Sequence, residues 1–287
     1  MDGISPERHV LAKAQTGAAL AVPVVSIVVP MQDEAPNIRP LVAAIHQSLL
    51  GRFDYEIVLV DDASRDATRQ IALALAAEAR QGNLPALRVI AHDTAGGQSA
   101  AVHSGVRAAR GRIIATLDGD GQNPPANLPA LIGPLLTLGR DPLLALVAGQ
   151  RVGRRDTLSK RLASRFANAL RSAVLQDGTR DTGCGLKAFD RAAYLALPYF
   201  NHQHRFLPAL FARDGWHIAH VDVSHAPRLA GRSKYTNLNR ALVGMTDLAG
   251  MAWLIRRRKR ARPVELSLPD LPLADLPLAD LSLSETP

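Results

Sequence analysis

Residues Arg112 to Pro125 read RIIATLDGDGQNPP and contain the pattern that decides the fold. The run 113–117 is β-branched and apolar, which is typical of a strand buried on both faces. Two aspartates, Asp118 and Asp120, follow it with one glycine between them. Ligands of an open α/β sheet bind at the carboxyl ends of its strands. The stretch therefore predicts a buried strand that delivers two carboxylates to a ligand-binding edge.

The spacing of these two carboxylates favours a shared cation. Two negative charges held so close would repel each other, and hard oxygen ligands suit Mg²⁺ or Mn²⁺. Gly119 and Gly121 place no side chain beside the acids, so a bulky ligand can approach the backbone. Gln122 adds a neutral polar group. A solvated acidic turn is the alternative, and the segments upstream argue against it.

Upstream, apolar runs alternate with segments of helical spacing. Buried strands are predicted at 24–30 and 55–60, with a shorter strand at 87–91 and another at 143–148. A further strand is predicted late in the chain, at 216–223. Helices are predicted at 37–50, from a cap at Ser64 or Asp66 to about residue 80, at 98–109 and from about 125 to 138. Later helices are predicted at about 158–175 and around 206–214. This alternation predicts an α/β fold with a mostly parallel central sheet flanked by helices. Neither Gly-x-Gly-x-x-Gly nor Gly-Lys-Ser/Thr occurs, which disfavours dehydrogenases and ATPases.

The 287 residues divide into four predicted parts. Residues 1–23 form a leader whose apolar run is too short for a signal-peptide core or a membrane span. Residues 24–237 form one α/β domain, and 238–262 form a helix with a basic end. Residues 263–287 are an acidic tail with a Pro/Leu/Asp repeat, and its proline density predicts disorder.

The net charge of +8 is unevenly distributed. Residues 264–287 hold five acids and no Lys or Arg, so the first 263 residues carry a net charge of +13. Such a surface favours an anionic partner, which can be a nucleic acid, an acidic lipid surface or a phosphorylated substrate. Cys184 is the single cysteine, so no internal disulfide can form, which suits a reducing compartment.

The segment 238–255 is the most hydrophobic late stretch, but Arg240 and Asp247 interrupt it, so a membrane-spanning helix is not expected. Six of the seven residues in 256–262 are basic. An amphipathic helix followed by a basic cluster predicts a peripheral anchor on an anionic membrane surface. An ordinary C-terminal helix with a solvated basic end is the alternative.

Four motifs resemble, in this order, the family 2 glycosyltransferases of the GT-A fold: VSIVVPMQDEAPNI at 25–38, EIVLVDDASRDAT at 56–68, GGQSAAVHSGVRAARG at 96–111 and IIATLDGDGQNPP at 113–125. Three later elements are similar to the polyprenyl-phosphate, or dolichol-phosphate mannose synthase-like, branch: AGQRVGRRDTLSKRLASRFAN at 148–168, DTGCGLKAFDR at 181–191 and RLAGRSKY at 228–235. The resemblance covers roughly residues 24 to 256.

The resemblance implies an enzyme that moves a sugar from a GDP- or UDP-hexose to undecaprenyl or dolichyl phosphate. It implies a metal-dependent, inverting reaction by a peripheral protein at the cytoplasmic face of the cytoplasmic membrane. Because a lipid phosphate is already an anionic nucleophile, no general base is required, and none is obvious in the sequence. Metal and nearby cations would stabilise the charge that develops on the leaving group.

The resemblance also assigns roles by position. The nucleoside would be held by Pro30, Gln32, Glu34, Val60 and Asp62. The metal would be held by Asp118, Asp120 and Gln122, with Gly119 beside the donor diphosphate. The phosphates would meet Arg151, Arg228 and Lys234, and the catalytic group comprises Asp118, Asp120, Arg151 and Arg228. The acceptor phosphate would lie near Ser164 and Arg165.

Alternatives remain open at this point. A sugar nucleotidyltransferase would need a glycine-rich basic loop near residues 26–37, which is absent there. A glycosyltransferase could instead use a cell-envelope glycan or a glycolipid as its acceptor. A nucleic-acid-binding protein is less compatible, because the sequence has no aromatic stacking platform or zinc-finger signature. The sugar, the nucleotide base, the lipid and the oligomeric state are not decided by the sequence.

Overall fold

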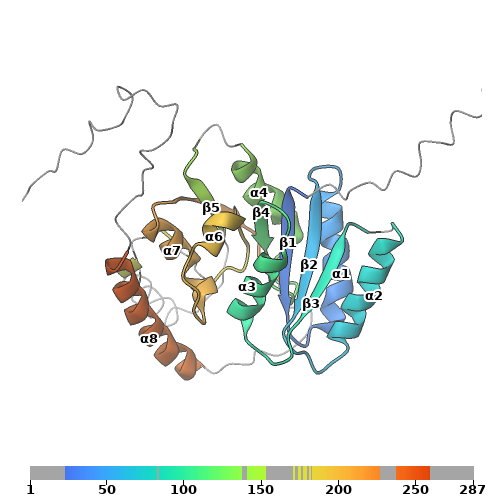
Figure 1. The fold of residues 1–287 in the computed structure, drawn as a ribbon, viewed down its shortest axis with the longest axis horizontal. Helices are drawn as coiled ribbons and strands as arrows, with labels where there is room; N and C mark the ends of the chain where they lie inside the picture. Colours follow the sequence, from blue (N-terminus) through green and yellow to red (C-terminus); the bar gives the residue numbers. More distant parts are fainter. Residues whose placement is uncertain are drawn as a thin grey trace, which may run out of the picture.

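The computed structural model describes residues 23–82, 84–137, 141–152, 171, 174–175, 177–179, 181, 183–226 and 237–258, the last range without side chains for 237–243. Its strands form one sheet in the order β3-β2-β1-β4-β6-β5-β7. Figure 1 shows β3, β2, β1 and β4 side by side. Their bounds are β1 Val25–Met31, β2 Tyr55–Asp61, β3 Leu87–Ala91, β4 Ile113–Thr116, β5 Leu144–Arg151, β6 Lys187–Asp190 and β7 His217–Val223. The mostly parallel α/β sheet predicted from the sequence is confirmed.

The helices predicted after β1, β2 and β3 are present, whereas the short α6 and η3 were not predicted. They are α1 Ala35–Leu49, α2 Thr68–Arg80, α3 Gln98–Ala108, η2 Pro125–Asn127, α4 Leu128–Leu136, α6 Arg191–Leu195, η3 Gln203–Arg205, α7 Leu207–Arg213 and α8 Asn237–Arg256. The predicted helix at 125–138 is divided into the 3₁₀ turn η2 and the shorter α4. Most of the predicted helix at about 158–175, the leader and the tail lie outside the described residues.

The core has two layers because buried strands expose alternate side chains to opposite faces of the sheet. One cluster joins Ile27, Ile57 and Ile113 to side chains of α1, α2 and α4. The other joins Val28 and Val58 to side chains of α3, α6 and α7. These three helices lie on the opposite face of the sheet from α1 and α2 (Figure 1). Each face of the sheet is therefore covered by helices, as expected for strands that are apolar throughout.

The register brings several strand ends to one edge. β1 pairs in parallel with β2 from Val25↔Tyr55 to Met31↔Asp61, and with β4 from Val25↔Ile113. The chain leaves β1 toward β2 on one side and returns to β4 on the other, so the order of strands reverses around β1. Such a reversal opens a crevice at the carboxyl ends of the strands, where open α/β sheets bind their ligands.

β6 is the one strand that the sequence analysis did not predict. It runs antiparallel to both β4 and β5, with Thr116 opposite Lys187 and Ala148 opposite Lys187. This strand has only four residues, KAFD, and a charged residue at each end, so it lacks the apolar run that marks the other strands. Because β6 is antiparallel, its first residue, Lys187, lies at the edge where β4 and β5 end.

Candidate active site

Asp118 and Asp120 lie directly after β4, at the edge that the sequence predicts. Gln98, at the start of α3, donates from Nε2 to Asp118 Oδ1 at 2.7 Å. Asn123 donates from Nδ2 to Asp118 Oδ2 at 3.0 Å. Asp120 is 7% exposed and accepts the backbone N–H of Gln122 at 3.1 Å. Neighbouring donors thus hold both carboxylates in fixed positions before any ligand arrives.

Gly185 packs against the carboxyl group of Asp118. A Cβ added at Gly185 would overlap both oxygens and the carboxyl carbon of Asp118. Gly119 is also confined, since a Cβ there would lie 3.1 Å from the carbonyl oxygen of Pro30. The segment before β6 therefore forms one wall of the site, and glycine is required there by space.

The electrostatics of Asp118 favour a nearby cation. Burial raises the pKa of Asp118, and the negative charge of Asp120 raises it further, while Lys187 opposes both effects. A divalent cation between the two carboxylates would offset this repulsion. Asn123 Oδ1 is buried without a hydrogen-bond partner among the described residues, so a hard oxygen ligand is available beside the acids.

These residues fit Mg²⁺ or Mn²⁺. Among the described residues there is no group of three or more His, Cys, Asp or Glu side chains placed to hold a metal ion. Mg²⁺ is commonly held by one or two carboxylates together with substrate phosphates and water. A site with two aspartates and amide oxygens is therefore suited to a metal that binds together with a phosphorylated substrate.

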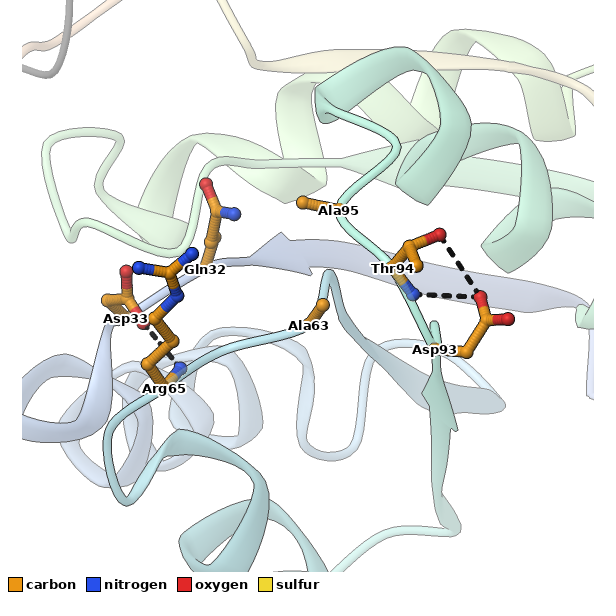
Figure 2. A pocket seen from close by; sticks show the side chains of 7 residues that line it. All are labelled: Gln32, Asp33, Ala63, Arg65, Asp93, Thr94 and Ala95. Carbon is orange, nitrogen blue, oxygen red and sulfur yellow. Dashed lines mark hydrogen bonds between the residues drawn. The ribbon is translucent and has the colours of Figure 1, made fainter.

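A larger pocket adjoins the ends of β1, β2 and β3. It measures ≈ 600 Å³, which lies within the range of small-molecule sites. Figure 2 shows Gln32, Asp33 and Arg65 on one side of it and Asp93, Thr94 and Ala95 on the other, with Ala63 between them. The pocket has the size and the polar lining expected of a nucleoside site.

Asp62 shapes the wall of this pocket. Its carboxylate accepts the backbone N–H groups of Gly96 at 2.7 Å and Gly97 at 2.8 Å. His92 Nδ1 lies 2.7 Å from Asp62 Oδ1. Gln32 donates from Nε2 to the Asp62 carbonyl oxygen at 3.2 Å. Asp62 thereby ties the loop 93–97 to the end of β2, and the loop supplies one side of the pocket.

The other residues predicted to hold the nucleoside differ in how deeply they are buried. Pro30 lines a small cavity next to Asp118. Glu34 accepts a hydrogen bond from Asn37 Nδ2 at 2.7 Å, at the start of α1. Val60 is fully buried in the core beneath α3, so its side chain has no exposed surface with which to contact a nucleoside.

Arg151 ends β5 and is paired with Asp181. Its Nε donates to Asp181 Oδ2 at 2.6 Å, and its Nη2 donates to Oδ1 at 2.8 Å. This pair raises the pKa of Arg151, so the guanidinium keeps its charge at any working pH. The same positive charge partly opposes the rise in the pKa of Asp118, which places Arg151 within electrostatic range of the aspartates.

Four predicted site residues lie outside the described residues: Ser164, Arg165, Arg228 and Lys234. Ala226, the last described residue before the segment that holds Arg228 and Lys234, donates from its backbone N–H to the Gln122 carbonyl at 3.0 Å. Asn127 Nδ2 also lies 3.1 Å from Ser224 Oγ. The chain after β7 is thus attached beside the Asp-Gly-Asp loop.

Sequence reasoning missed Gln98, Gly185 and Lys187 as site residues. Gly183 and Gly185 are closely spaced in the segment 181–191, but the sequence does not identify which side chains meet Asp118. Gln98 stands at the start of a predicted helix after Gly96-Gly97, and this position was the available signal.

Paired carboxylates and a nucleoside-sized pocket at one edge of the sheet are features expected of an α/β protein of the nucleotide-sugar transferase class. Comparison with known proteins agrees, since the family model described as glycosyl transferase family 2 matches residues 26–197. The chain belongs to this family and is a glycosyltransferase.

Its relatives by sequence include polyprenyl-phosphate sugar enzymes. It is 33% identical over 239 residues to a dodecaprenyl-phosphate galacturonate synthase of Rhizobium johnstonii, covering 82% of this chain and 68% of that one. It is 33% identical over 229 residues to an undecaprenyl-phosphate 4-deoxy-4-formamido-L-arabinose transferase of Pseudomonas paraeruginosa. That match covers 79% of this chain and 64% of the longer relative, slightly less than two thirds of its length.

Solved structures share the fold. Glucosyl-3-phosphoglycerate synthase from Mycobacterium tuberculosis in complex with UDP matches with a TM-score of 0.61 at 22% identity, covering 80% of each chain. The same enzyme in complex with Mg²⁺ and UDP matches with a TM-score of 0.60, covering 81% of this chain and 79% of that one. At this identity the likeness shows the GT-A fold and does not transfer the substrates.

Proposed function

We propose that this glycosyltransferase transfers a sugar from a GDP- or UDP-linked donor to a polyprenyl phosphate, with inversion at the anomeric centre and dependence on Mg²⁺ or Mn²⁺. The observation that carries the proposal is that Asp118 and Asp120 follow β4 at the same edge of the parallel sheet as the ≈ 600 Å³ pocket, which lies at the ends of β1, β2 and β3. The named activities of the two sequence relatives support the choice of a lipid-phosphate acceptor.

The donor is expected to lie along the edge from β3 to β4. Its nucleoside would occupy the pocket beside Gln32, and its diphosphate would extend toward Asp118 and Asp120. The metal, when bound, would supply positive charge to the leaving diphosphate. Gln122 and Asn123 would add amide oxygens to its ligands, and Arg228 and Lys234 would add cations from the segment that begins after Ala226.

The acceptor needs little chemical activation. A phosphate monoester is an anion at neutral pH, so it can attack the anomeric carbon without a general base. The barrier then depends on bringing two anions together, and positive residues reduce that repulsion. Arg151, Ser164 and Arg165 are the residues we assign to this task, in the segment where the acceptor phosphate would lie.

We further propose that the protein works at the cytoplasmic face of the cytoplasmic membrane, held there by α8. Leu248, Met251 and Leu254 of this helix pack toward α6 and α7, while Met245 and Trp253 on its outer side are each 61% exposed. The exposed Arg256, Arg257 and Arg258 follow at its end. An apolar stripe with adjacent arginines suits an anionic lipid surface. No helix in the described part of the chain is both long and apolar enough to cross a membrane.

A product assay tests the proposal. Purified protein with Mg²⁺ or Mn²⁺ is incubated with a panel of GDP- and UDP-sugars and undecaprenyl phosphate, and the lipid fraction is read by mass spectrometry. We expect a sugar-phosphate lipid from one donor. Donor hydrolysis without a lipid product would move the acceptor to a glycan or glycolipid. The absence of turnover and of binding with every donor would contradict the proposal.

A further inference from the structure

A small cavity lies beside Asp118 and is separate from the pocket proposed for the nucleoside. It measures ≈ 20 Å³, and its lining includes Gln98, Asp118, Gly185, Lys187 and His204. This volume holds about one water-sized group. Gln98 is exposed, whereas Lys187 is only 4% exposed, so the cavity leads from the candidate active site into the protein.

Lys187 brings unused hydrogen-bond donors to this cavity. The ammonium has three N–H donors, and within the described part of the chain it is bonded to one acceptor, the carbonyl oxygen of Cys184. Burying a charged group whose donors lack acceptors is costly. Burial accordingly lowers the pKa of Lys187, against the attraction of Asp118. An oxygen acceptor in the cavity would remove this cost.

His204 adds a second donor. The Ser99 hydroxyl oxygen accepts the backbone N–H of His204 at 3.2 Å and lies 2.7 Å from His204 Nδ1. The hydroxyl proton is thus directed to Nδ1, which we assign as the acceptor nitrogen, so the ring proton sits on Nε2. Burial lowers the pKa of His204 to about 3, which keeps this neutral form at working pH.

Asp118 completes the pattern as an acceptor. Each of its oxygens receives one protein hydrogen bond, from Gln98 and from Asn123, and a carboxylate has about four acceptor positions. A group that accepts from Lys187 and donates to Asp118 therefore fits the cavity. A hydroxyl has both properties and the size of one water molecule, whereas a carboxylate or a phosphate has too many atoms for this volume.

We propose that one hydroxyl group of the transferred sugar enters this cavity and accepts a hydrogen bond from Lys187. Lys187 is then a sugar-binding residue that contributes to the choice of donor, separate from the pocket that takes the nucleoside. The inference rests on the proposed function, because it needs a nucleotide sugar with its diphosphate near Asp118 and Asp120.

Titration calorimetry with nucleoside diphosphates and with the matching nucleotide sugars tests the inference. Wild type and Lys187→Met are titrated, with Mn²⁺ present, with UDP, UDP-glucose, GDP and GDP-mannose. We expect the variant to bind the nucleoside diphosphate within about twofold of wild type. Its affinity for the matching nucleotide sugar, and its kcat/KM in the lipid assay, should fall roughly 10- to 100-fold, since a hydrogen bond to a charged donor is lost. Arg80→Met, at an exposed basic residue ending α2, is the matched control.

Other results would overturn the inference. Equal losses for UDP and UDP-glucose would show that Lys187 acts on the diphosphate or the metal, and unchanged affinity for both would show that it contacts neither. Nucleotide sugars that each lack one sugar hydroxyl provide a further test. The nucleotide sugar that lacks the hydroxyl bound by Lys187 should bind wild type and Lys187→Met with equal affinity. Thermal melting of the variant verifies its fold. If wild type binds no nucleotide sugar at all, the proposed function fails first, and this is visible without the variant.

Discussion

At the scale of single residues, the pocket that we propose for the nucleoside is lined by two residues with strained backbones. Asp33 has φ of 56° and Ala63 has φ of 54°, in the left-handed region that residues with a Cβ rarely adopt. Both residues line the ≈ 600 Å³ pocket (Figure 2). Such strain persists only where the surroundings hold it, and it is concentrated at ligand sites. These two left-handed residues turn the chain after β1 and after β2, so that both segments line the pocket.

Replacing Ala63 by glycine should therefore stabilise the fold. Glycine adopts positive φ without the Cβ conflict, and we expect a gain of roughly 0.5–1 kcal/mol in the free energy of unfolding by urea. Asp33→Gly serves as the contrast, since the Asp33 carboxylate accepts the Arg65 backbone N–H at 2.8 Å and this bond would be lost. If Ala63→Gly proved less stable than wild type, the strain at this position would be refuted.

His204 makes stability depend on pH. Its pKa is lowered from 6.5 to about 3 by burial and by the charges of Lys187, Arg205 and His202. Between pH 6.5 and about pH 3, the His204 imidazole is protonated in the unfolded chain and neutral in the folded chain. The free energy of unfolding therefore falls as the pH drops from 6.5 toward 3. From neutral pH to about pH 5, His204 should cost about 2 kcal/mol of stability.

The comparison of wild type with His204→Asn isolates this contribution. Asparagine places an acceptor near the position of Nδ1 and does not titrate. Urea unfolding at about pH 7.5 and about pH 5 should show a pH-dependent loss smaller by about 2 kcal/mol in the variant. Equal losses in both proteins would mean that His204 is protonated in the folded state.

At the scale of elements, the sequence predicts strands well where they are apolar and buried. The segment 87–91 has the predicted bounds, and the strand before Asp118 ends within one residue of its prediction. β6 escaped prediction because its pattern is tertiary: Lys187 is buried by its neighbours β4 and β5 and not by an apolar run of its own. Sites formed across β6, including the Lys187 cavity, could therefore not be predicted.

The outer side of α8 gives a prediction for the membrane. Met245→Ser together with Trp253→Ser should reduce co-sedimentation of the full chain with vesicles of anionic phosphatidylglycerol by about tenfold or more. Replacing Arg256 by Gln should reduce it about fivefold, and only at low salt. Leu73→Ser removes a side chain that is 54% exposed on α2 and is the matched control. Unchanged sedimentation of the double variant would contradict membrane docking through α8.

At the scale of the whole molecule, the sequence predicts which residues lie at the carboxyl ends of the strands. It does not predict the hydrogen bonds that these residues make with distant segments. The Asp-Gly-Asp loop and the two upstream strand ends share one edge, because parallel strands end together. The partners of Asp62 could not be predicted, because Gly96 and Gly97 lie 34 and 35 residues away and meet it only through the β2–β3 pairing. Val60, which the resemblance assigned to the nucleoside, has its side chain fully buried in the core.

In the proposed function, Asp118 and Asp120 support a metal-dependent sugar transfer to a lipid phosphate. The most direct measurement follows the lipid-linked sugar made by wild type and by Asp120→Asn, with and without EDTA, using the donor that the panel identifies. Asp141→Asn, at an aspartate whose side chain is 38% exposed, is the control. We predict product from wild type and Asp141→Asn only when metal is present, and a loss of roughly 10³-fold or more in Asp120→Asn. Near-normal turnover by Asp120→Asn, with its fold intact, would contradict the account.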